Sequence, residues 1–139
     1  MDMSTETLLP KRPYLFRAFY DWIIDNQLTP QIVVNTTVQG VNVPSEYVKD
    51  GQIILNIAPH AIGQFIMNND AIEFNARFNG IMQAIYIPMA AIEALYAREN
   101  NEGLGFAPEI YYEQQNAKPI VEQAQTTQSK SKPTFKVVK

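Results

Sequence analysis

The sequence offers few side chains that could carry out catalysis. Its 139 residues include one histidine, His60, and no cysteine. An activated nucleophile needs a base within hydrogen-bonding reach, and His60 is the only histidine that could be that base. No catalytic motif surrounds it in residues 59–63, so a surface loop position is the better interpretation. We therefore expect that the protein is not an enzyme.

The sequence also shows no residue pattern typical of a metal site or a nucleotide site. Without cysteine there is no thiolate ligand, and the carboxylates show no spacing typical of a metal site. The six glycines match neither a dinucleotide-binding fingerprint nor a phosphate loop. We expect no metal and no cofactor.

Charge and composition divide the chain near residue 106. Residues 1–106 hold 6 Lys and Arg against 11 Asp and Glu, a net charge of −5, whereas residues 107–139 hold 5 against 3, a net charge of +2. An acidic body argues against binding to nucleic acid or anionic membrane, because both require clustered positive charge. We predict a folded domain over 1–106.

Two further segments follow that domain. Residues 107–129 are rich in Gln and other polar residues and predict a flexible linker. In residues 130–139, Phe135, Val137 and Val138 form an apolar island between lysines. On composition alone, this island is either a short docking motif or a frayed terminus.

The location of the protein follows from what the sequence lacks. No run approaches the roughly 18 apolar residues of a membrane helix, and the acidic start differs from a basic signal peptide. The absence of cysteine suits a reducing compartment. We expect a cytoplasmic protein.

An unusually apolar helix is predicted from residue 12 or 13 to about residue 26. Pro13 is favourable at a first helical position. One apolar stripe holds Leu15, Ala18, Phe19, Trp22 and Ile23, and a second holds Phe16, Tyr20 and Ile24. A helix on a sheet buries one stripe, so the second either packs inside the same domain or contacts another chain. We predict a homodimer whose interface contains Phe16, Tyr20 and Ile24.

After Pro30 the apolar period changes from that of a helix to that of strands. The predicted strands cover residues 32–38, 53–58, 64–67, 72–78 and 81–87, with tight turns at Asp50-Gly51 and Asn79-Gly80. Ile92, Leu95 and Tyr96 have helical spacing and predict a short helix after Pro88. The fold class is therefore mainly β with helices (α+β), a small barrel or sandwich preceded by a helix.

The alternation of apolar and polar side chains along the predicted strands leaves one face of the sheet available for a ligand. Ile72, Phe74, Ala76 and Phe78 share one side of their strand, and Glu73, Asn75 and Arg77 share the other. Small and polar residues also lie beside apolar ones at residues 54–58. Such a surface could accept an extended peptide, so the residues favour a binding module.

Long strings of the sequence closely resemble the SspB family, stringent starvation protein B of proteobacteria. The resemblance covers roughly residues 11–108 and resumes at the last seven. The strings that carry it are RPYLFRAFYDW (12–22), DNQLTP (25–30), DGQIILNIAP (50–59), FNARF (74–78) and YAREN (96–100).

This resemblance implies an Sm-like β fold behind an N-terminal dimerising helix. It also implies an adaptor that binds the ssrA tag of proteins from stalled ribosomes and tethers them to the ClpXP protease. The implied partners are ssrA-tagged polypeptides, the ClpX N-terminal domain and a second copy of the chain. An Sm-like RNA-binding or RNA polymerase-associated starvation regulator is the alternative.

Carried over to this sequence, the resemblance implies a peptide groove and a docking tail. Ala58 would leave space for the tag, so Ala58→Val should narrow the groove, and Arg77 would bind acidic tag residues. Phe135, Val137 and Val138 would dock on ClpX, with Phe135 where an aliphatic residue is more familiar. The implied peptide-binding residues are Asn26, Gln27, Leu28, Ile57, Ala58, Pro59, Asn75, Ala76, Arg77 and Phe78.

Overall fold

The computed structural model describes residues 8–117. It divides into two compact units, of which one is 9–107 and the other includes residues 108–117. The second unit contains helix α2 (Ile110–Ala117), so the first part of the predicted linker is helical, contrary to expectation. Residues 118–129 of that linker lie outside the described residues, as does the predicted docking motif with Phe135, Val137 and Val138.

Helix α1 (Arg12–Asp25) confirms the predicted N-terminal helix, and a proline lies in its first turn. The helix ends where Gln27 adopts a left-handed φ of 60°. The amide of Leu28 then donates to the Ile23 carbonyl, and the amide of Gln27 donates to the Ile24 carbonyl. This pair of bonds satisfies carbonyls that would otherwise lack partners at the helix end.

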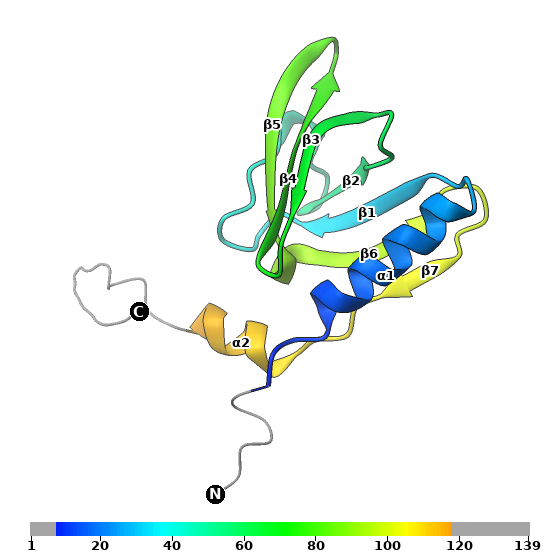
Figure 1. The fold of residues 1–139 in the computed structure, drawn as a ribbon. Coiled ribbons are helices and arrows are strands. Elements are labelled where there is room, and N and C mark those ends of the chain that lie inside the picture. The colour runs from blue at the N-terminus through cyan, green and yellow to red at the C-terminus, as the bar shows by residue number, and fades with distance from the viewer. Residues whose placement is uncertain (1–7, 118–139) are drawn as a thin grey trace, which may run out of the picture. The chain divides into compact units, whose positions relative to one another are not determined.

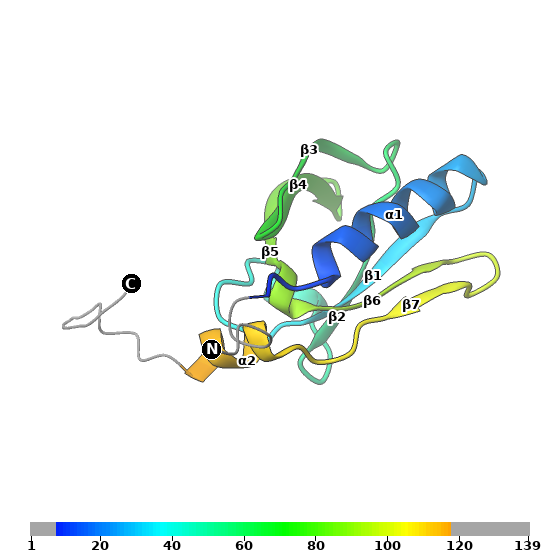
Figure 2. The same cartoon turned by 60° about the horizontal axis from the view of Figure 1, so that its bottom comes forward.

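The described strands form two antiparallel sheets and no closed barrel. The four-stranded sheet has the order β2-β1-β6-β7, and the three-stranded sheet has the order β3-β4-β5. Figures 1 and 2 show α1 lying across a face of the four-stranded sheet. The predicted α+β class is confirmed. The strands are β1 (Pro30–Asn35), β2 (Gln52–Asn56), β3 (Ile62–Met67), β4 (Ala71–Phe78), β5 (Ile81–Pro88), β6 (Ile92–Ala97) and β7 (Gly103–Gly105).

The two predicted tight turns are confirmed by their backbone angles. Asp50 and Gly51 have φ values of 53° and 75°, and Asn79 and Gly80 have φ values of 53° and 79°. Two successive positive φ values give the turn that matches the twist of an antiparallel hairpin. The second turn fixes the register of β4 and β5, in which Phe78 lies opposite Ile81.

The predicted helix after Pro88 is wrong beyond its first turn. A short 3₁₀ turn covers Met89–Ala91, and strand β6 follows at once. The register between β1 and β6 shifts so that Val33 pairs with Ala94 and Val34 with Ile92. One extra residue in β6 lets both Ile92 and Leu95 face the core, where each is fully buried. That bulge reproduces the i, i+3 spacing of a helix.

The buried side chains of the larger unit come from α1 and from both sheets. Strand β2 alternates as predicted, with Ile53 and Leu55 buried and Ile54 exposed. The largest fully buried side chains are Phe16, Ile23, Ile32, Val34, Ile57, Ile72, Ile87, Met89, Ile92 and Leu95. Among residues 8–117, no helix is both long enough and apolar enough to span a membrane.

Arg12 is a buried cation at the start of α1, with only 6% of its surface exposed. Its guanidinium donates to the carbonyl oxygens of Met89, Ala90 and Ile92 at 3.0 to 3.1 Å and to that of Ala107 at 3.1 Å. It also lies 5.6 Å from the centre of the Phe106 ring. One side chain therefore joins the first turn of α1 to the turn before β6 and to the end of the larger unit.

Arg12→Met should lower the free energy of unfolding by about 3 kcal/mol, because it keeps most of the side-chain volume but removes the donor to four carbonyl oxygens. Urea denaturation of both proteins measures this difference. Arg98→Met, which replaces an exposed arginine, should stay within about 0.5 kcal/mol of the original chain. A loss for Arg12→Met as small as that of the control would contradict the structural role of Arg12.

Candidate functional site

An open pocket of about 330 Å³ lies where β3, β4 and β5 meet the loop that precedes β3. Register explains its composition, because Ile62 pairs with Ala76, Gly63 pairs with Asn75 and Arg77 pairs with Met82. The lining residues are His60, Ala61, Ile62, Gly63, Asn75, Ala76, Arg77 and Met82.

Because several lining side chains are small, backbone atoms form much of the surface of this pocket. Ala61, Gly63 and Ala76 contribute little volume. A Cβ atom at Gly63 would have no neighbouring atom within 4 Å, so glycine at this place keeps space open. The ladder between β3 and β4 is also irregular beyond Gly63, and bulges of this kind re-aim the adjoining backbone. The pocket can therefore offer backbone groups to an elongated ligand.

Two polar side chains in the pocket already have hydrogen bonds. The side-chain amide of Asn75 donates to Oε1 of Gln64 at 3.0 Å. The Arg77 guanidinium donates to the Gly80 carbonyl at 3.2 Å. Because a guanidinium has five N–H donors, Arg77 keeps further donors for an anionic ligand while the turn holds its position. The pocket thus combines one oriented cation with apolar and backbone surface.

The structure brings three of the predicted peptide-binding residues, Asn75, Ala76 and Arg77, into one pocket. Pro59 is exposed beside it in sequence but is not part of its lining. Phe78 does not line it either, because its half-buried ring packs against Tyr47 with centroids 5.0 Å apart.

Ile57 and Ala58 correct the sequence prediction. They have 0% and 1% of their surface exposed, so their side chains cannot line a groove in this conformation. They lie between β2 and the loop residues that line the pocket. Ala58→Val would crowd the core instead of narrowing the pocket, because close-packed interiors have no room for added methyl groups.

The predicted residues at the end of α1 lie outside the pocket lining. Asn26, Gln27 and Leu28 form the turn that ends the helix. The next residue, Thr29, donates its amide and hydroxyl to the Glu99 carboxylate at 2.8 and 2.6 Å. These bonds, that of the hydroxyl foremost, lower the pKa of Glu99 from its ordinary value. The turn is therefore fixed to the end of β6.

Sequence reasoning missed five lining residues, His60, Ala61, Ile62, Gly63 and Met82. The predicted turn at Asn79-Gly80 was enough to find Met82, because a two-residue hairpin turn places Met82 opposite Arg77. The other four required the register of β3 against β4, which no short sequence signal gives. Within residues 8–117, no group of three or more potential metal ligands occurs.

The predicted dimer stripe is largely turned inward. Phe16 is fully buried, and Tyr20 and Ile24 are half-buried, so this stripe packs inside the domain, the other outcome that the sequence left open. The first stripe is divided, because Ile23 is fully buried whereas Leu15 and Trp22 are 38% and 45% exposed. Ala18, Phe19 and Trp22 also line a mostly apolar pocket of about 360 Å³ with Glu102 and Gly103.

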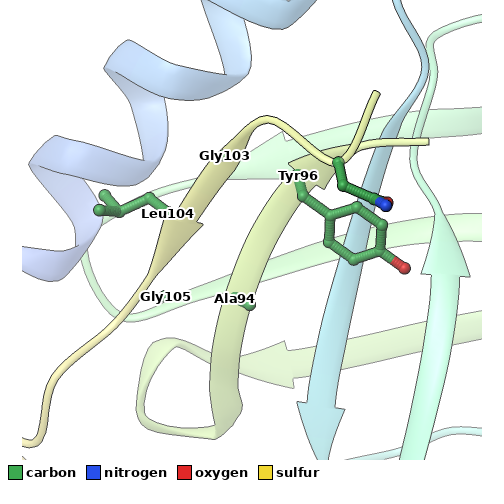
Figure 3. Close-up of a pocket in the computed structure, with 6 residues that line it drawn as sticks. Ala94, Tyr96, Gly103, Leu104 and Gly105 are labelled. Carbon is green, nitrogen blue, oxygen red and sulfur yellow. The ribbon is translucent and has the colours of Figure 1, made fainter. Parts of the chain in front are cut away.

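Another pocket, of about 340 Å³, lies over β6 and β7. Figure 3 shows Leu104 directed toward α1, whereas the Tyr96 ring is directed to the other side of the sheet. The polar side chains that line this pocket are Tyr96 and Asn101. None of the predicted binding residues lines the pocket. It is therefore a weaker candidate than the pocket at β3, β4 and β5.

Comparison with known proteins agrees with the resemblance. The family model of SspB, stringent starvation protein B, matches residues 10–138. The chain belongs to the SspB family. The stringent starvation protein B homolog of Haemophilus influenzae is 56% identical over 114 residues, which are 82% of this chain and 76% of that protein. The SspB match includes both the pocket and the stretch beyond residue 117.

Proposed function

We propose that this chain is a non-catalytic adaptor that binds the ssrA degradation tag and delivers tagged proteins to ClpXP. The observation that carries the proposal is the meeting of Asn75, Ala76 and Arg77 in one open pocket. The resemblance to SspB implies tag contacts for the same three residues. Membership of the family supports the same assignment.

The chemistry of the pocket suits an extended acidic peptide. Its small side chains expose backbone, which can exchange hydrogen bonds with a peptide main chain, and Met82 and Ile62 supply apolar surface. Arg77 offers charge-assisted hydrogen bonds to a carboxylate. His60, which also lines the pocket, is exposed, which suits a contact residue more than a buried catalytic base.

Fluorescence anisotropy of a labelled ssrA peptide tests tag binding. The original chain should show saturable binding at micromolar concentration or tighter. Gly63→Val should weaken it about tenfold or more, equivalent to about 1.4 kcal/mol, because the added side chain enters the open pocket. Gly105→Val is the matched control, since its Cβ would also have no atom within 4 Å, and it should bind normally.

Two outcomes would contradict the proposed site. An original chain that does not bind the peptide would remove tag recognition altogether. Equal binding by the original chain and Gly63→Val, with both shown to be folded by circular dichroism, would move the peptide away from this pocket.

We also propose that the exposed stripe of α1 forms a homodimer. Leu15, Ala18, Phe19 and Trp22 define this stripe. Large apolar side chains gathered on one helix face commonly mark an interface, because their exposure to water is unfavourable. A two-fold axis would bring the same stripe of each copy together.

Trp22→Glu should convert the dimer to a monomer, because a charge would replace apolar surface in the interface. Sedimentation equilibrium measures the mass in solution. Tyr86→Glu is a matched control, since Tyr86 is a similarly exposed aromatic residue on β5, and it should remain dimeric. A monomeric original chain, or a dimer that survives Trp22→Glu, would contradict this interface.

We further propose that residues 130–139 dock on the N-terminal domain of ClpX through Phe135, Val137 and Val138. The segment combines apolar side chains with flanking lysines. The SspB match extends to residue 138 and so includes this segment except for its last residue.

Deleting residues 130–139 should leave ssrA-peptide binding unchanged and abolish the faster degradation of a tagged protein by ClpXP. The two assays separate capture of the tag from delivery to the protease. Replacing only Phe135, Val137 and Val138 with serine, which keeps the lysines, should have the same effect. Normal delivery by the truncated chain would refute docking through this segment.

A further inference from the structure

Tyr20 reaches from α1 to the chain segment that leads into the pocket. Its hydroxyl donates to the carbonyl oxygen of Ile57 at 3.1 Å. Its ring is stacked on Phe65 of β3, with centroids 5.4 Å apart and planes 10° apart. Tyr20 does not line the pocket itself. It therefore contacts the chain on both sides of the pocket wall formed by residues 60–63.

The backbone around this wall is held by a short series of hydrogen bonds. The Ile57 amide donates to the Pro30 carbonyl at 2.9 Å, and the Ala61 amide donates to the Ala58 carbonyl at 2.8 Å. The Ala58 amide donates to Oδ1 of Asn56 at 2.9 Å. The Ile57 carbonyl is fixed by the Tyr20 hydroxyl. Among these bonds, only that of Tyr20 comes from α1.

We propose that Tyr20 is a positioning residue, which sets the shape of the pocket for its peptide without touching that peptide. The Tyr20 hydroxyl fixes residue 57 before the loop, and the Tyr20 ring fixes residue 65 after the end of the loop. An extended ligand would lie against the wall between these two points. This inference rests on the proposed binding of the ssrA tag at the pocket.

The protonation state of Tyr20 is consistent with this role. Partial burial raises the pKa of the Tyr20 hydroxyl from its ordinary value, and the negative charge of Asp21 acts in the same direction. The hydroxyl is therefore protonated at neutral pH and can donate to Ile57. The stacking of the same ring on Phe16, with centroids 6.1 Å apart, keeps the side chain directed into the domain.

Tyr20→Phe tests the proposal, because it removes the hydroxyl and retains the ring. We expect the dissociation constant for a labelled ssrA peptide to rise about fivefold. Tyr14→Phe is the matched control on the same helix, where the lost hydroxyl accepts a hydrogen bond from Asn69 outside the pocket. It should bind within about twofold of the original chain.

Amide hydrogen exchange separates positioning from a general loss of stability. In Tyr20→Phe, the Ala61 amide should exchange faster, whereas the amides in the middle of β1 should exchange as in the original chain. Unchanged peptide affinity, unchanged exchange at Ala61, or an equal loss in Tyr14→Phe would each overturn the proposal. If the original chain does not bind the peptide, the proposed function fails, and exchange at Ala61 still decides whether Tyr20 holds the loop.

Discussion

The guanidinium of Arg12 is the interaction on which the placement of α1 depends. A buried cation is unfavourable unless its donors are satisfied, and here four carbonyl oxygens from two distant parts of the chain accept from it. The 3₁₀ turn before β6 and the end of the larger unit therefore meet at the first turn of the helix. Phe106 extends this junction by stacking on Phe16 in the second turn, with centroids 6.4 Å apart. With its first turn held at this junction, α1 runs across the four-stranded sheet in the direction that Figures 1 and 2 show.

In this orientation one side of α1 faces the core and the other side faces solvent. The inward side carries Phe16 and Ile23 into the core and brings Tyr20 to the carbonyl of Ile57. The outward side presents Leu15 and Trp22 to solvent. A chain of aromatic contacts, Phe16 to Tyr20 to Phe65 to Phe74, links the helix to β3 and β4. The surface proposed for a second copy and the side chain proposed to position the pocket wall, Tyr20, therefore belong to the same helix.

Local signals in the sequence predicted much of this arrangement, and their failures have a common cause. The proline in the first turn of α1 and the turns at Asp50-Gly51 and Asn79-Gly80 act over a few residues, so sequence alone was enough to find them. Strand β6 was mistaken for a helix because its bulge is set by pairing with β1, which lies about sixty residues earlier in the chain. Phe16, which was predicted on a dimer surface, is fully buried inside the domain for a similar reason. Periodicity shows that a helix has two apolar stripes, but only its packing against the rest of the domain determines which side chains of each stripe are buried.

The candidate site shows the same division between local pattern and long-range packing. Asn75, Ala76 and Arg77 are consecutive on β4, so a resemblance over one short string was sufficient to find them. The opposite wall, residues 60–63, follows a segment that is hydrogen-bonded to Tyr20, Asn56 and Pro30. Because Ala61, Gly63 and Ala76 are small, the proposed peptide would fit the pocket mainly through the position of the backbone. In the proposed site, Ile57 and Ala58 would therefore act through the position of the backbone, because their own side chains are buried.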